Sequence, residues 1–185
     1  PGTFWRGAAA LRLYAPGYEA QSAAVISPSA LKIKLVFATG PDAYASVAPY
    51  GTASAGQNGA PTIAAVGLPQ FANPAFYVNL ANAYPGASAL LAWSAAPANA
   101  YAGTGGGDVR LNVDFGPTTI FGFYARLVDA QGTASVGFSI PSFDPASVGV
   151  HVYAQWFLIG DPGAQPTVYG VNLAATAALD VRVGL

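Results

Sequence analysis

The chain has 185 residues, of which 53% are hydrophobic, and its seven basic and eight acidic side chains give a net charge of −1. This hydrophobic share is enough for a folded core and excludes a disordered chain, while the scattered basic residues exclude a nucleic-acid footprint. Apolar runs stay below the roughly 18 residues of a membrane-spanning helix, and the absence of Cys excludes disulfides and thiolate chemistry.

Pro1 stands where an initiator Met is usual. Two explanations are expected: cleavage of an export signal, or simple removal of Met before Pro1. The first would place the protein outside the cell, and the second would not.

The first predicted element is an extended N-terminal arm, residues 1–15. One face of this arm is apolar apart from its first residue and consists of Thr3, Trp5, Gly7, Ala9, Leu11, Leu13 and Ala15. The other face carries Arg6, Arg12 and Tyr14. Two interpretations stay open: an ordinary edge or first strand of the chain's own sandwich, and a strand donated to a neighbouring copy by strand addition.

Residues 16–49 are predicted to form a strand pair and a connecting loop. In the segment 31–37 the odd positions are large and apolar while Lys32 and Lys34 are even, which is the period of a half-buried strand. The predicted assembly interface combines the arm with this strand and consists of Trp5, Ala9, Leu11, Leu13, Leu31, Ile33, Leu35 and Phe37. The terminal strand 177–183 is the other candidate to accept the arm.

The segment 41–61 is rich in Gly, Pro, Ser and Ala and is expected to be a long loop or linker.

Residues 50–185 are predicted to form a continuous β-sandwich. Short apolar runs separated by Gly, Pro, Asn and Asp turns predict its strands, at 75–80, 89–93, 109–113, 118–126, 134–140, 148–159 and 177–183. The Ala-rich stretch 174–178 is interpreted as strand positions whose small side chains let two sheets approach closely. The predicted fold class is all-β, an antiparallel β-sandwich with an N-terminal extended arm.

A series of short motifs follows the same order from residue 50 to the end. They are Tyr50-Gly51-Thr52, Gly67-Leu68-Pro69, Asn73-Pro74-Ala75-Phe76, Asn82 to Ala87, Asp129 to Ala134, Ile140-Pro141, Val152 to Trp156 and Asp161 to Ala164. In this series the chain resembles a β-sandwich module found at the C-termini of secreted proteins of some environmental bacteria. The resemblance implies export and a non-catalytic sandwich. Many members have a Cys after the opening motif, where Ala53 stands here, so any disulfide is lost.

His151 is the only His, and no nucleophile-elbow pattern is present. A histidine base needs an oriented nucleophile and an acidic partner, which the sequence does not place beside it. We therefore expect a partly exposed polar residue, no catalytic residues and no enzymatic activity.

The acidic residues Asp42, Asp108, Asp129, Asp144 and Asp161 fall in turns, where a carboxylate caps nearby backbone N–H groups. The pairs Asp108 with Asp114 and Asp144 with Asp161 are the only candidates for calcium between loops. Gly103 to Gly107 lacks the Lys and the helix of a phosphate-binding loop and is expected to be a hairpin tip. No cofactor and no metal are predicted.

Trp93 and Trp156 lie within apolar runs and are expected in the core, with a sugar-stacking platform as the alternative.

The low charge weakens the repulsion that normally keeps proteins apart. The sequence therefore favours a secreted, self-associating structural subunit of an extracellular filament or surface layer. The alternative is a secreted carbohydrate-binding or adhesion module.

Overall fold

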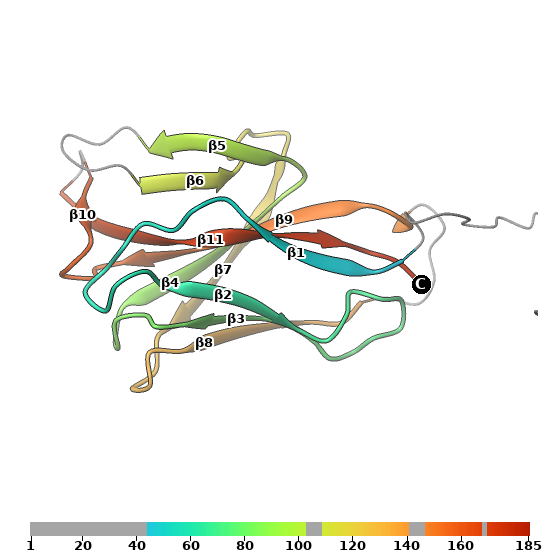
Figure 1. Cartoon of the computed structure of the whole chain (residues 1–185), viewed down its shortest axis with the longest axis horizontal. Coiled ribbons are helices and arrows are strands. Elements are labelled where there is room, and N and C mark those ends of the chain that lie inside the picture. The colour runs from blue at the N-terminus through green and yellow to red at the C-terminus, as the bar shows by residue number, and fades with distance from the viewer. Residues whose placement is uncertain (1–43, 103–108, 141–146, 168–169) are drawn as a thin grey trace, which may run out of the picture. The chain divides into compact units, whose positions relative to one another are not determined.

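The computed structural model describes residues 44–102, 109–140, 147–167 and 170–185, which all fall within one compact unit, Ala38–Leu185 (Figure 1). Within these ranges the chain forms strands and no helix. The strands are β1 (Ser46–Tyr50), β2 (Thr62–Val66), β3 (Phe76–Ala81), β4 (Ser88–Ser94), β5 (Pro97–Ala102), β6 (Val109–Val113), β7 (Ile120–Leu127), β8 (Ala134–Phe138), β9 (His151–Ile159), β10 (Gln165–Pro166) and β11 (Asn172–Arg182).

These strands form three sheets, and every pairing between them is antiparallel. The large sheet has the order β1-β11-β9-β4-β7, with β10 beside β11; the two smaller sheets are β2-β3-β8 and the hairpin β5-β6. The prediction of an all-β antiparallel fold is therefore confirmed.

The main core lies between the large sheet and the β2-β3-β8 sheet. Alternate residues of β4 and β9 supply it from the large sheet, among them Leu91, Trp93 and Trp156. Phe76 and Val78 of β3 face them from the small sheet. Trp156 is fully buried and Trp93 nearly so, which confirms the prediction that both belong to the core.

The opposite face of the large sheet is covered in part by the β5-β6 hairpin, as Figure 1 shows. Val109 and Val113 of β6 pack there against Ala175 and Ala178 of β11. These two alanines are fully buried, so their small side chains let β6 lie close to the sheet. The interpretation of the 174–178 stretch as close-packed strand is confirmed.

A network of buried hydrogen bonds from the Gln155 side-chain amide holds β6 against the face of the large sheet. Gln155 Oε1 accepts a hydrogen bond from Asn112 N at 2.8 Å, and Gln155 Nε2 donates to Arg110 O at 3.0 Å and to Thr176 O at 2.7 Å. The register of β11 shifts between Ala175 and Ala178, which leaves the Thr176 carbonyl free for this contact. The side chain of Gln155 thus supplies hydrogen bonds to β6 on the side where the described residues contain no further strand of its sheet.

Two expectations need correction. The segment 41–61 is not wholly a loop, because Ser46–Tyr50 pairs with Ala178–Arg182 as strand β1 of the large sheet. The predicted terminal strand is not a free edge that might accept the arm, since β11 has β1 on one side and β9 on the other. In both cases the deciding partners are more than 100 residues apart in the sequence.

In the part of the chain that the structure describes, we find no helix with the length and apolar character needed to cross a membrane.

Candidate assembly surface

Strand β7 forms one edge of the large sheet. Its residues pair with β4 on one side, from Leu127 opposite Ser88 to Ile120 opposite Ser94, and the described strands leave its other side unpaired. The register shifts between Trp93 and Ser94, which makes Phe121 a bulged residue. The run Gly122 to Ala125 is therefore paired in regular register with β4 and has no strand among the described residues on its other side, although Ala125 O accepts a hydrogen bond from Arg126 Nη1 at 2.8 Å.

The side chains of this edge are large, apolar and exposed. The exposed fractions are 62% for Phe121, 47% for Phe123, 43% for Tyr124 and 71% for Leu127. Edge strands are usually blunted by Lys, Pro or inward charges. The only charge on β7 is that of Arg126, whose Nε donates to Ser135 O at 3.2 Å at the end where the chain turns into β8. The stretch before Arg126 contains no charge and no Pro, and its one irregularity is the bulge at Phe121, which limits regular pairing at the start of β7.

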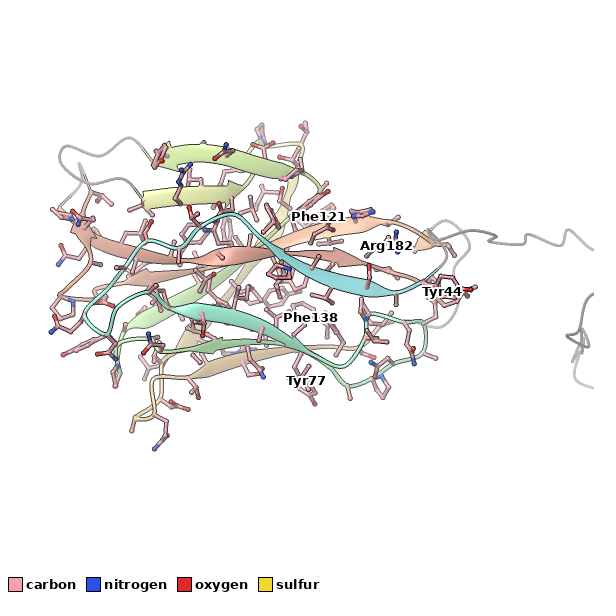
Figure 2. The ribbon with its side chains drawn as sticks, viewed as in Figure 1. Tyr44, Tyr77, Phe121, Phe138 and Arg182 are labelled. Carbon is pink, nitrogen blue, oxygen red and sulfur yellow. The ribbon has the colours of Figure 1, made fainter. Side chains whose placement is uncertain are left out.

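A pocket of about 420 Å³ opens beside this edge. Its walls are Trp93, Phe121, Gly122, Phe123, Tyr124, Phe138 and Val152. Phe138 comes from β8 and forms edge-to-face contacts with Trp93 and Tyr124, at ring-centroid distances of 4.3 Å and 5.2 Å. Figure 2 labels Phe121 and Phe138, which lie on different strands of this wall.

Gly122 keeps the pocket open. It lies opposite Trp93 in the β4-β7 register, and a Cβ placed on it would meet no atom within 4 Å. A larger residue there would point over the indole ring of Trp93. Tyr124 has the one accessible polar side-chain group of the lining, since the Trp93 indole N–H is buried and has no acceptor within the described residues. The pocket is therefore suited to an aromatic or aliphatic group.

The other face of the β7 edge continues the apolar surface. Phe123 stacks on Phe115 at 5.9 Å, and Phe115 contacts Phe157 edge-to-face at 5.4 Å. Next to them lies a shallow apolar depression of about 270 Å³, lined by Leu90, Leu111, Phe115, Phe157, Ile159 and Leu173.

His151 has an acidic partner that the sequence analysis missed. Its Nδ1 lies 2.7 Å from Asp180 Oδ1, and its ring stacks at 6.3 Å on Tyr153. Both strands bring these residues to one face, although 29 residues separate His151 from Asp180. The side chain of His151 is 42% exposed, as expected for a partly exposed polar residue. No hydrogen bond within the described ranges joins its other ring nitrogen to a hydroxyl group.

The turn carboxylates behave as predicted where they are described. Asp129 accepts hydrogen bonds from Gln131 N, Thr133 N and the Thr133 hydroxyl, and these bonds lower the pKa of its carboxyl group. Asp161 accepts from Gln57 N at 2.8 Å and from Gly163 N at 3.0 Å. Asp42, Asp108 and Asp144 lie outside the described residues, so one member of each pair considered for calcium lies there as well. Within the described ranges no three metal-ligating side chains come together.

The eight residues of the predicted assembly interface, Trp5, Ala9, Leu11, Leu13, Leu31, Ile33, Leu35 and Phe37, also lie outside the described residues. Sequence reasoning predicted a strand at 118–126 but not its position at an edge. A signal was present, because Phe121, Phe123, Tyr124 and Leu127 place large apolar groups on both faces of one strand. Such a pattern is typical either of a central strand or of an edge that becomes covered.

Tyr50 links β1 to the buried amide network, and its ionisation offers a test of that packing. Its hydroxyl donates to Asn112 O at 2.6 Å, and burial, together with Tyr153 and Asp180 nearby, raises its pKa above the usual 10.0. A raised pKa means that the neutral phenol contributes stability below pH 10, and that this contribution is lost as the pH rises further.

We expect Tyr50→Phe to lower the free energy of unfolding by about 1 kcal/mol at pH 7, through the lost hydrogen bond. The loss relative to wild type should shrink between pH 10 and 12, because only the wild type must keep this phenol neutral. Urea unfolding across this pH range measures both effects. An unchanged difference between the two proteins at high pH would contradict the assigned burial.

No protein-family model matches this chain, and neither a curated protein nor a solved structure is significantly similar to it.

Proposed function

We propose that this chain is a non-enzymatic, self-associating structural subunit of an extracellular filament or surface layer. In this proposal the N-terminal arm of one copy, residues 1–15, adds a strand to the free edge of β7 in the next copy. The observation that carries the proposal is the edge of β7, which is apolar and exposed and which the described strands leave unpaired. The resemblance to modules of secreted proteins supports the extracellular location.

The edge of β7 contrasts with the edge at the opposite side of the large sheet. There β1 contains Pro49, and Arg182 Nε donates to Tyr44 O just before the strand begins. Proline cannot donate a ladder hydrogen bond, so β1 is protected against strand addition. Of these two edges, β7 is the acceptor that the chemistry favours.

The arm is suited to be the donor. Strand addition gains its affinity from main-chain hydrogen bonds and its register from alternate side chains that enter pockets, and the arm alternates in this manner over residues 3–15. Large apolar side chains such as Trp5, Leu11 and Leu13 contribute roughly 1.5–3 kcal/mol each when buried. The donor and acceptor surfaces differ, so the contact is head-to-tail and propagates into a filament unless it closes into a ring.

Carbohydrate binding is the second candidate, and the exposed aromatic cluster at β7 favours it. Phe121, Phe123 and Tyr124 provide flat apolar faces of the kind that stack on sugar rings. A sugar also needs hydrogen bonds to its hydroxyl groups, and among the pocket residues only Tyr124 offers an accessible polar side-chain group. We therefore place this function second.

A complementation experiment tests the proposal. One variant lacks residues 1–15 and so has no donor; a second carries Phe121→Lys and Phe123→Lys and so has a blunted acceptor. Each alone is expected to be monomeric by light scattering. An equimolar mixture should form dimers that grow no further, because each dimer contains one intact donor arm bound to one intact β7 edge, and we call this contact the joint.

Tyr77→Lys is the matched control for the charged substitutions. Tyr77 is 41% exposed, but it lies on β3, which has β2 and β8 on its two sides (Figure 2). This variant should assemble as the wild type does. A wild-type chain that stays monomeric at high concentration, or assembly that persists in the Phe121→Lys, Phe123→Lys variant, would overturn the proposal.

A further inference from the structure

We infer that the pocket beside Gly122 receives the indole ring of Trp5 from the arm of a neighbouring copy, and that this contact fixes the register of the joint. The inference rests on the proposed function and names the side chain that the acceptor site recognises. It follows from the position, the chemistry and the neighbours of the pocket.

The position of the pocket matches an added strand. Gly122 and Tyr124 lie opposite Trp93 and Leu91 and so share the face of β7 that looks toward the main core. A strand that pairs with Gly122–Ala125 projects every second side chain toward this face. The residue opposite Gly122 meets no β7 side chain and therefore enters the pocket over Trp93 and Phe138.

The chemistry of the pocket matches an aromatic ring. Five of the seven lining residues are aromatic, and none is charged. Aromatic rings prefer edge-to-face and offset contacts, and Phe138 already makes edge-to-face contacts with Trp93 and Tyr124. Trp5 is the only aromatic residue on the apolar face of the arm.

The arm residues two positions before and after Trp5 are small enough to lie opposite Tyr124, the β7 residue next to the pocket. Tyr124 is the next β7 residue on the pocket face and stands 43% exposed, so it needs a small residue across from it. With Trp5 opposite Gly122, the residue opposite Tyr124 is Thr3 in an antiparallel joint and Gly7 in a parallel one. Either choice leaves room for the phenol ring.

The test uses full-length variants and measures the dissociation constant of self-association by sedimentation. Trp5→Ala is expected to weaken association about 100-fold, since it removes the most buried contact of the joint. Phe4→Ala is the matched control: it removes a ring from the neighbouring position, which points to the other face, and should change association less than about tenfold.

A size swap separates pocket filling from general damage to the arm. Val152 lines the pocket from β9, and Val152→Phe fills part of it. This variant should weaken association with the wild-type arm, and Trp5→Leu in the same chain should recover most of the loss. Circular dichroism of each variant establishes that the fold is retained.

Tryptophan fluorescence gives a second measurement. Trp93 and Trp156 are buried, so a red-shifted, acrylamide-accessible component that is absent from Trp5→Phe belongs to Trp5. It should become protected on assembly. Self-association with an unprotected Trp5, or without loss in Trp5→Ala, overturns this inference and leaves the proposed function standing. Protection of Trp5 in a strictly monomeric chain overturns both.

Discussion

Replacing Gln155 by Ala is expected to lower the free energy of unfolding by about 3–5 kcal/mol, a large part of the 5–15 kcal/mol typical of a domain. Gln155 is fully buried, and its amide satisfies the backbone groups of Asn112, Arg110 and Thr176. Without it Asn112 N and Arg110 O lose their partner, because the described residues contain no strand on this side of β6, and Thr176 O keeps only the longer contact with Asn112 Nδ2 at 3.4 Å.

Two further variants show whether hydrogen bonds or packing dominate this loss. Gln155→Leu keeps most of the side-chain volume and removes every hydrogen bond, so it should be nearly as destabilising as Gln155→Ala. Gln165→Ala, on the exposed strand β10, should change stability by less than about 0.5 kcal/mol. Urea unfolding gives all three values. A Gln155→Leu protein as stable as wild type would show that the amide network contributes nothing.

Replacing Gly163 by Ala is expected to cost about 3 kcal/mol. A Cβ on Gly163 would lie 2.4 Å from Gln57 Cα and 2.5 Å from Gln57 N, both backbone atoms. The loop would have to move away, and the hydrogen bond from Gln57 N to the buried carboxylate of Asp161 would be lost with it.

Gly160→Ala is the control for this substitution. Gly160 has φ +82°, but a Cβ there meets nothing within 4 Å, so the variant suffers backbone strain without a clash. It should cost about 1 kcal/mol. Thermal unfolding of both proteins compares them, and a Gly163→Ala variant as stable as Gly160→Ala would contradict the tight contact between the two loops.

Several strands follow directly from local sequence. The run 109–113 was predicted with the bounds that β6 has, and the runs 89–93 and 75–80 fall within a residue of β4 and β3. These segments are bounded by Gly, Pro, Asn or Asp, and their side chains face a core. Strands β1 and β5 were missed because they are rich in Ala, Pro, Ser and Asn and become strands through their partners. Strand β2 was missed although its Thr, Ile and Val are good strand formers.

The candidate site was less accessible to sequence reasoning than the strands. The Phe and Tyr residues of β7 indicate an apolar surface, but only the strand order shows that this surface lies at an edge. The contact of His151 with Asp180 likewise depends on the β9-β11 register. This register places Arg182 opposite His151 and Asp180 opposite Tyr153, so Asp180 is the diagonal neighbour of His151. Register is a property of paired strands and cannot be read from one of them.

The sequence by itself determined the all-β class, the absence of disulfides, the low charge and the burial of Trp93 and Trp156, because composition and the period of two act locally. The tertiary structure alone decided that β11 lies inside the large sheet, that β1 forms one edge, and that the described strands leave β7 unpaired at the other edge. These outcomes depend on which distant segments pair, and the pairing is set by long-range packing around Gln155, Trp156 and the small residues of β11.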